Sequence, residues 1–306
     1  MMTADRSEGR DVHIFAASDP QHAIGGLWRN DTITQRTFLS MLEILIVSTT
    51  SYDVYRRSPR AKVQYTDQLL EAGDYDIESE GTIVVTDERY CPRTSSTISS
   101  LSASGRLKSF TKAVRERDGR CVISGLRNPQ ALYGRWYGFE AAHIFPLALE
   151  AEFTAHNYRR WITNAQDGDA LNSVQNGLLL SSIVHKLFDQ YQISINPDDD
   201  YRIICFLEDF LDLSGRTVDP ICRNPLDDRR VSDGLLRWHF RHAVFANMRG
   251  AGEPTFEDDF PPGSDMLGTI RNGTNAGDWM EFQLNARLRG TFDSQGTNSI
   301  EEPLGK

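Results

Sequence analysis

The sequence has little of what marks secreted, membrane or thiolate-zinc proteins. Its four cysteines are scattered and form no Cys-x-x-Cys pair, which argues against a disulfide framework and a four-thiolate zinc site. No apolar run approaches the ~18 residues that span a bilayer, and the longest, MLEILIV, is interrupted by Glu43. The amino-terminal MMTADRSEGRDVH has no apolar segment typical of a secretory signal. We therefore expect free thiols, an intracellular location in the cytoplasm or nucleus, and no membrane association.

A basic excess is also missing. The formal net charge is -10, which argues against a protein that coats nucleic acid without specificity. The charge is unevenly spread, because residues 105–206 hold 12 Lys and Arg against 11 Asp and Glu. Residues 1–104 hold 10 against 15, and residues 207–306 hold 11 against 17. A polyanionic partner is therefore best tolerated by the middle of the chain.

Hydrophobic residues make up 39% of the 306 residues, which is enough for a substantial core. The pattern predicts an α+β fold in four parts. A mixed α/β flanking segment covers residues 1–94, a Ser-rich linker covers 95–104, and a central domain with a carboxy-terminal helix covers 105–250. Residues 251–306 are rich in Gly, Asp, Asn and Pro, so we expect a largely disordered tail there.

The central domain shows clear local signals for helices and strands. We expect half-exposed positions for His239 and His242 on its last helix. Ser181 or Ser182 can cap its short helix, and Ser232 or Asp233 its last one. The predicted elements, in chain order, are a basic amphipathic helix (106–118), a strand and turn (120–125), a strand (138–146), a long polar loop (148–173), a short strand (176–181), a short helix (182–190), a hairpin (191–206) and a long helix (232–250).

Four chemically distinctive side chains gather in the unit of strand, loop, short strand and helix. His143 lies near the end of the first strand and Asn176 precedes the second, while His185 and Asp189 are four residues apart on the helix. Residues at this spacing project from one helical face. An imidazole and a carboxylate suit one divalent metal ion, such as Mg²⁺, Mn²⁺, Ni²⁺ or Zn²⁺. Two protein ligands leave positions open for water and a phosphate oxygen, as a catalytic metal requires.

The remaining residues then acquire natural roles in hydrolysis. His143, with an ordinary pKa of ~6.5, can accept a proton from water at neutral pH. Asn176 can donate and accept hydrogen bonds at once, so it can fix the orientation of His143, and Gly177 allows a tight turn. Asp189 and Asn176 both also have an interpretation without a catalytic role. Asp189 would be a charged residue on a solvated helix surface, and Asn176 would be part of an Asn-Gly turn.

Three blocks of this region resemble the HNH, or ββα-metal, endonucleases, in particular HNH domains common in fungal proteins. The blocks are RERDGRCVISG, EAAHIFP and NGLLLSSIVHKLFDQYQISINP, and the nine-residue interval from Asn176 to His185 fits the family. The resemblance covers roughly residues 105–206 and implies a ββα-metal (HNH) unit. It implies that His143 is the general base, that Asn176 orients it, and that His185 and Asp189 hold the metal.

One position departs from the family. HNH nucleases often carry an Asp or His metal ligand directly before the base, where this chain has Ala142. Glu140 is the nearest carboxylate, but we expect it to face away from His143 unless a bulge brings it in. The resemblance implies a metal-dependent endonuclease whose partner is nucleic acid, with DNA favoured over RNA. Because of Ala142, the alternatives are a weakened HNH fold that binds nucleic acid without cutting it, or a protein-interaction module.

Overall fold

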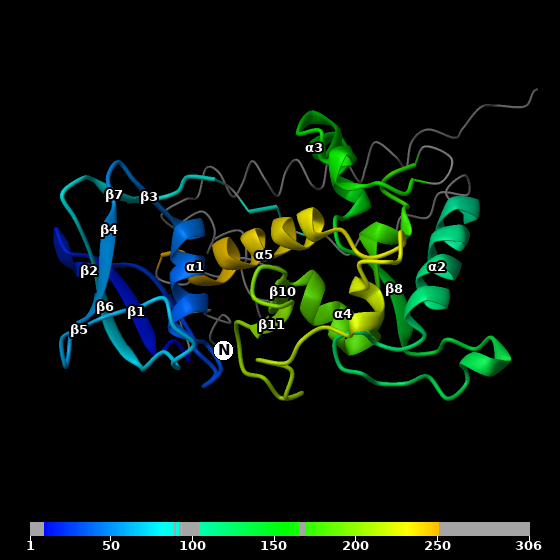
Figure 1. Cartoon of the computed structure of the whole chain (residues 1–306), viewed down its shortest axis with the longest axis horizontal. Helices are drawn as coiled ribbons and strands as arrows, with labels where there is room; N and C mark the ends of the chain where they lie inside the picture. Colours follow the sequence, from blue (N-terminus) through cyan, green and yellow to red (C-terminus); the bar gives the residue numbers. More distant parts are fainter. Residues whose placement is uncertain (1–8, 89, 92, 94–103, 166–168, 251–306) are drawn as a thin grey trace, which may run out of the picture. The chain divides into compact units, whose positions relative to one another are not determined.

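Five strands at the amino-terminal end form one sheet in the order β2-β1-β6-β4-β5 (Figure 1). Strands β1 and β6 run parallel, and the other neighbours are antiparallel. A separate antiparallel pair joins β3 to β7. The bounds are β1 Val12–Ala16, β2 Asp19–Leu27, β3 Ile46–Ser48, β4 Tyr52–Arg56, β5 Ala61–Lys62, β6 Gly73–Ser79 and β7 Ile83–Val85.

Helix α1 (Gln35–Leu45) is the helix of this part of the chain. Thr34 caps it, because the Thr34 hydroxyl accepts a hydrogen bond from the Thr37 amide at 3.2 Å. Four apolar residues recur at three- and four-residue spacing and are fully buried, as an amphipathic helix on a core requires: Phe38, Met41, Leu42 and Leu45. The mixed α/β character expected for this segment is therefore present.

The structure is a computed structural model that describes residues 9–88, 90–91, 93, 104–165 and 169–250. These residues all belong to one unit, residues 5–255. The expected linker, apart from Ser104, and the expected tail at 251–306 lie outside the described residues. Within the described part of the chain, no helix has the length and apolarity needed to cross a membrane.

A ββα unit occupies the centre of the predicted domain (Figure 1). Strand β8 (Phe139–His143) pairs antiparallel with β9 (Gly177–Ser181) in regular register, from Phe139 opposite Ser181 to His143 opposite Gly177. Helix α4 (Ser182–Asp189) follows β9 directly, and helix α2 (Ser104–Asp118) packs on the same two strands. The predicted order of strand, strand and helix is thus confirmed, and so is the α+β fold class.

Gly177 is required for packing and not for a turn. Its backbone φ is -129°, which any residue adopts. A Cβ atom at this position would lie 2.5 Å from Val114 and 2.7 Å from the Phe110 ring, both on α2. The glycine therefore allows α2 to approach β9 closely, and the expectation of a tight turn is wrong.

The rest of the unit surrounds this centre. The expected strand at 120–125 is instead a series of turns with an isolated bridge between Arg120 and Arg127. Ser181 and Ser232 hold the N-cap positions of α4 and α5, but neither side chain caps its helix. The remaining bounds are η1 Ala131–Tyr133, η2 Leu147–Leu149, α3 Glu150–Ala155, η3 Tyr158–Trp161, η5 Val174–Asn176, β10 Ile193–Asn196, β11 Arg202–Cys205, η6 Pro220–Arg223 and α5 Asp233–Met248.

Candidate active site

His185 lies between two carboxylates. Its Nδ1 is 2.5 Å from Glu140 Oε2, and its Nε2 is 3.2 Å from Asp189 Oδ2. Asp189 reaches the ring because it lies one turn further along α4, as the sequence predicted. The Ser182 hydroxyl donates a hydrogen bond of 2.7 Å to the other oxygen of Glu140. Desolvation raises the pKa of the Glu140 carboxyl, but the bonds from His185 and Ser182 outweigh it, so this pKa is lowered.

Glu140 reaches His185 without a bulge. The register of β8 against β9 is unbroken at every residue, so side chains alternate regularly between the two faces of the strand pair. Glu140 therefore shares a face with Ala142, the position where the family often has a ligand, and α4 packs on β8 from that side. Glu140 therefore faces away from His143, as predicted for a regular strand, and it joins the site through His185 without a bulge.

Arg93 is a member of the site that the sequence did not reveal. Its Nε and Nη2 lie 3.0 and 2.9 Å from Asp189 Oδ1, and its Nη2 donates to the His143 carbonyl at 2.5 Å. Its Nη1 also donates to the Ile144 carbonyl. The side chain is 4% exposed and its guanidinium lies over the Phe188 ring. Arg93 therefore joins Asp189 to the backbone at and after His143.

His143 is held on both sides. Its ring stacks on Phe110 of α2 with centroids 3.9 Å apart, and its Nε2 lies 3.2 Å from Asn172 Oδ1. Asp169 accepts a bond of 2.8 Å from the Asn172 amide nitrogen, which leaves the Asn172 oxygen facing His143. Nε2 must therefore carry the proton, since Asn172 Oδ1 can only accept. The Nδ1 lone pair has no hydrogen-bond partner among the described residues.

Electrostatics keep His143 neutral. Burial lowers the pKa of the imidazole to about 4, and the bond to Asn172 acts in the opposite direction. The charges of Arg93 and His185 lower this pKa further, while that of Asp189 raises it. A ring with this pKa can accept a proton throughout the neutral range, although a low pKa also makes it a weaker base.

Asn176 forms hydrogen bonds to the backbone that follows His143. The residue is fully buried, and its Oδ1 accepts a bond of 2.7 Å from the Phe145 amide. Its Nδ2 donates to the carbonyls of Phe145 and Leu171, at 3.0 and 2.8 Å. Its own carbonyl accepts from the Ile144 amide at 2.8 Å. Asn176 thus fixes the two residues after His143 and the loop that ends beside Asn172, but it does not touch the His185–Asp189 pair.

Two donor atoms of this site fit one divalent metal ion. Neighbouring ligands about 2.0–2.2 Å from a metal lie about 3 Å apart, and His185 Nε2 lies 3.2 Å from Asp189 Oδ2. Glu140 on Nδ1 matches the carboxylate that typically orients a metal-bound histidine. Among the described residues, no group of three His, Cys, Asp or Glu side chains is placed to hold a metal. Glu140 and Asp189 take opposite nitrogens of His185, and position 142 is alanine.

Comparison with protein families gives matches for two parts of the chain. Residues 121–196 match the family described as HNH endonuclease, and residues 9–84 match a domain of unknown function (DUF8573). The chain therefore contains a domain of the HNH endonuclease family, and all four predicted site residues fall within the matched range. HNH domains are in general hydrolytic nucleases that act on nucleic acids and use a divalent metal. No curated protein and no solved structure matches the chain.

Proposed function

We propose that the chain is a metal-dependent endonuclease that hydrolyses phosphodiester bonds, with DNA as its preferred substrate. One observation carries the proposal: Arg93 contacts both Asp189 of the imidazole–carboxylate pair and the backbone carbonyl of His143. His143 is a neutral histidine whose Nδ1 has no hydrogen-bond partner among the described residues. His185 and Asp189 are 22% and 28% exposed, so the pair is accessible from solvent.

Each residue takes one role. His143 accepts a proton from the attacking water at Nδ1, and Asn172 stabilises the resulting cation through the proton on Nε2. A divalent ion on His185 Nε2 and Asp189 Oδ2 would neutralise charge on the phosphate and on the leaving oxygen. Asn176 is a positioning residue, since it holds the backbone that follows His143.

A plasmid-nicking assay tests this function. Supercoiled plasmid is incubated with the full chain and Mg²⁺, Mn²⁺, Ni²⁺ or Zn²⁺, and with a chelator as control. We expect nicked circles with at least one metal and none with the chelator. His185→Ala should lose cleavage at low metal concentration and regain part of it at high concentration, because the metal is bound by fewer ligands. Intact plasmid with all four metals and the wild-type chain would contradict the proposal.

A second prediction concerns Glu140. Glu140→Gln should weaken metal binding by about 10- to 100-fold, the usual cost of losing a group that supports a metal ligand. The amide still fills the space, but it no longer holds His185 Nδ1 as an anion does. Calorimetric titration with Mn²⁺ measures the effect, and Glu208→Gln, at an exposed position, is the matched control. Equal Mn²⁺ affinities for Glu140→Gln and wild type would show that Glu140 does not support metal binding.

A second function has one observation in its favour. Arg93 is a buried cation bound to Asp189 Oδ1, and Ala142 offers no ligand. A guanidinium can balance the carboxylate without a metal, which would leave an HNH fold that binds nucleic acid and does not cut it. In the nicking assay, Ala142→Asp restores the family's usual ligand. Cleavage by this variant together with none by wild type would favour the binding function.

A further inference from the structure

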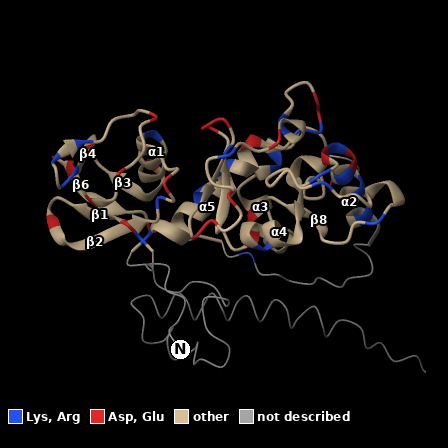
Figure 2. Cartoon of the chain, turned by 90° about the horizontal axis from the view of Figure 1, so that it is seen from below, with Lys and Arg blue, Asp and Glu red and all other residues tan. Residues whose placement is uncertain are grey.

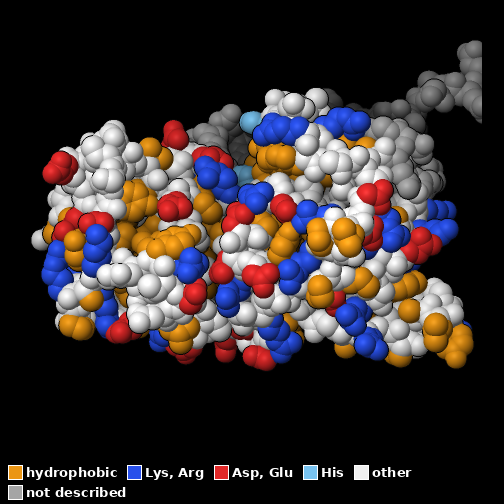
Figure 3. Space-filling model, viewed as in Figure 1, with side chains coloured by type: hydrophobic (Ala, Val, Ile, Leu, Met, Phe, Trp, Pro, Cys, Tyr) orange, Lys and Arg blue, Asp and Glu red, His pale blue; other side chains and the backbone are white. Residues whose placement is uncertain are grey.

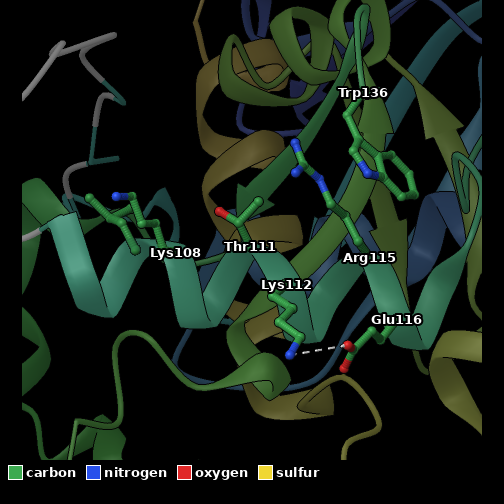
Figure 4. A pocket seen from close by; sticks show the side chains of 7 residues that line it. Lys108, Thr111, Lys112, Arg115, Glu116 and Trp136 are labelled. Carbon is green, nitrogen blue, oxygen red and sulfur yellow. Dashed lines mark ion pairs between the residues drawn. The ribbon is translucent and has the colours of Figure 1, made fainter. Parts of the chain in front are cut away.

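A groove of about 450 Å³ runs along the outer side of helix α2 (Figure 4). Its lining positions recur at helical spacing, while Phe110 and Val114 point inward and are buried. Trp136 reaches the groove from the loop between α2 and β8. The side chains that matter here are Lys108, Thr111, Lys112, Arg115, Glu116 and Trp136.

Three cations line the groove, Lys108, Lys112 and Arg115, and they are poorly neutralised by carboxylates. Neither Lys108 nor Arg115 forms an ion pair within the part of the chain that the structure describes. Arg115 Nε has no hydrogen-bond partner among the residues that the structure describes, and the guanidinium lies 4.8 Å from the centre of the Trp136 ring. Lys112 approaches Glu116 at 3.8 Å, an exposed pair of little energetic weight. In a chain of net charge -10, Lys108 and Arg115 are thus cations without an ion pair among the described residues. Figure 2 marks the Lys and Arg positions of the chain in blue, those of α2 among them.

The loop that carries Trp136 also presents exposed rings to solvent. Residues 126–138 contain no Asp or Glu. Tyr133 and Tyr137 of this loop are 76% and 84% exposed, and Leu132 is 94% exposed. Figure 3 shows hydrophobic side chains at the tip of this loop, at the lower right of the view. Exposed rings beside unpaired cations are the combination with which proteins bind single-stranded nucleic acid, because every unpaired base offers a face for stacking.

We propose that the α2 groove and the 126–138 loop bind a single-stranded polynucleotide. Lys108, Lys112 and Arg115 contact the backbone phosphates, and Trp136 with the loop tyrosines stacks on the bases. A duplex fits less well, since its bases are already stacked and offer no free faces.

This inference rests on the proposed nuclease function and deepens it, because it names the substrate as one with a single-stranded segment. Phe110 of α2 stacks on His143. A strand in the groove therefore lies about one helix diameter, ~10 Å, from the catalytic base. Helix α2 lies between the groove and His143, so the cut would fall in a part of the polynucleotide that extends past the groove.

Binding without metal tests the proposal independently of cleavage. Fluorescence anisotropy with labelled oligo-dT, oligo-rU and a blunt duplex of equal length is measured in chelator, from about 50 to about 200 mM salt. The variant Lys108→Gln/Lys112→Gln/Arg115→Gln should lose roughly 10-fold or more in affinity for oligo-dT. Its slope of log affinity against log salt should fall by about 2, which is three contacts at about 0.7 each for a single strand. Trp136→Ala should cost roughly 5- to 100-fold through lost stacking.

Arg60→Gln/Lys62→Gln is the matched control, since both cations lie on the amino-terminal part and are paired with carboxylates. It should bind as wild type does. The groove variants should also still hydrolyse a small diester such as bis(p-nitrophenyl) phosphate, if the wild type does. Wild-type affinity and salt slope in the triple variant would overturn the proposal, and so would an equal loss on the blunt duplex. The ratio of oligo-dT to oligo-rU affinity tells whether the strand is DNA or RNA.

Discussion

His143→Ala should reduce plasmid cleavage by about 10²- to 10⁴-fold, the usual contribution of a general base. Metal affinity should stay close to that of wild type, because His143 bonds to Asn172 and stacks on Phe110 and contributes no ligand atom. Single-turnover cleavage rates and a Mn²⁺ titration on the same preparation measure the two effects separately. His185→Ala should mainly lower the Mn²⁺ affinity, because His185 Nε2 is a proposed ligand atom, and its cleavage rate should fall as a consequence.

The pH dependence provides a second measurement on the same residue. Because burial lowers the pKa of His143 to about 4, cleavage should not vary with pH through this group from about 5 to neutrality. The unfolded chain, with an ordinary histidine pKa of ~6.5, binds the proton first as pH falls. As the pH falls from about 6.5 to 4, His143 should therefore lower the free energy of unfolding. His156→Ala, at an exposed position, is the control for the effect of replacing a histidine. A His143→Ala enzyme that cuts at the wild-type rate would refute the assignment.

The sequence predicted the parts of the site that depend on local order. Two strands and a helix, together with the four-residue spacing of His185 and Asp189, are properties of short segments, and both are present. Arg93 and Asn172 were not predicted, because their roles depend on contacts far along the chain. Arg93 lies 96 residues from Asp189, and Asn172 lies 29 residues from His143. A lone arginine beside a Ser-rich stretch carries no periodic signal.

The sequence predicted the mixed α/β character of the amino-terminal segment but did not reveal strand β6, for a related reason. In β6, Tyr75 and Ile77 are buried while their neighbours are partly exposed, so a short alternation was its only signal. The polar residues next to them, Asp74 and Asp76, are of a type that is depleted in strands. The strand forms because β1 and β4 pair with it on either side.

The prediction for His239 and His242 was wrong, since they are 0% and 4% exposed. Helix α5 contacts α1, β2 and β10, so only a narrow stripe that includes Arg237 and Arg241 reaches solvent, and the two histidines lie outside this stripe. The polar groups of His239 are satisfied internally: its Nδ1 lies 2.7 Å from the Ser194 hydroxyl, and its Nε2 lies 3.1 Å from the Phe188 carbonyl. Burial lowers the pKa of both rings, that of His242 to about 3.

Asp118→Ala should lower the free energy of unfolding by about 3–5 kcal/mol, the usual cost of leaving one member of a buried ion pair alone. Arg117 and Asp118 have side chains only 1% and 0% exposed, and they form two parallel bonds of 2.6 and 2.9 Å. Asp118 also accepts from the Leu179 amide of β9 at 2.8 Å. Without its carboxylate, a buried guanidinium would remain with only backbone carbonyls as partners.

Those carbonyls connect the pair to the candidate site. Arg117 donates to Val174 and Gly177, at 2.7 and 2.6 Å, on either side of Asn176. Losing the pair should therefore loosen the loop that positions His143 as well as the end of α2. Urea unfolding at neutral pH measures the effect, and Asp198→Ala, from an exposed pair with Arg237, should cost at most about 1 kcal/mol. Arg117→Met/Asp118→Leu should recover part of the loss, because apolar side chains leave no buried charge. A cost for Asp118→Ala no larger than that of the exposed control would show that β8, β9 and α2 pack without this pair.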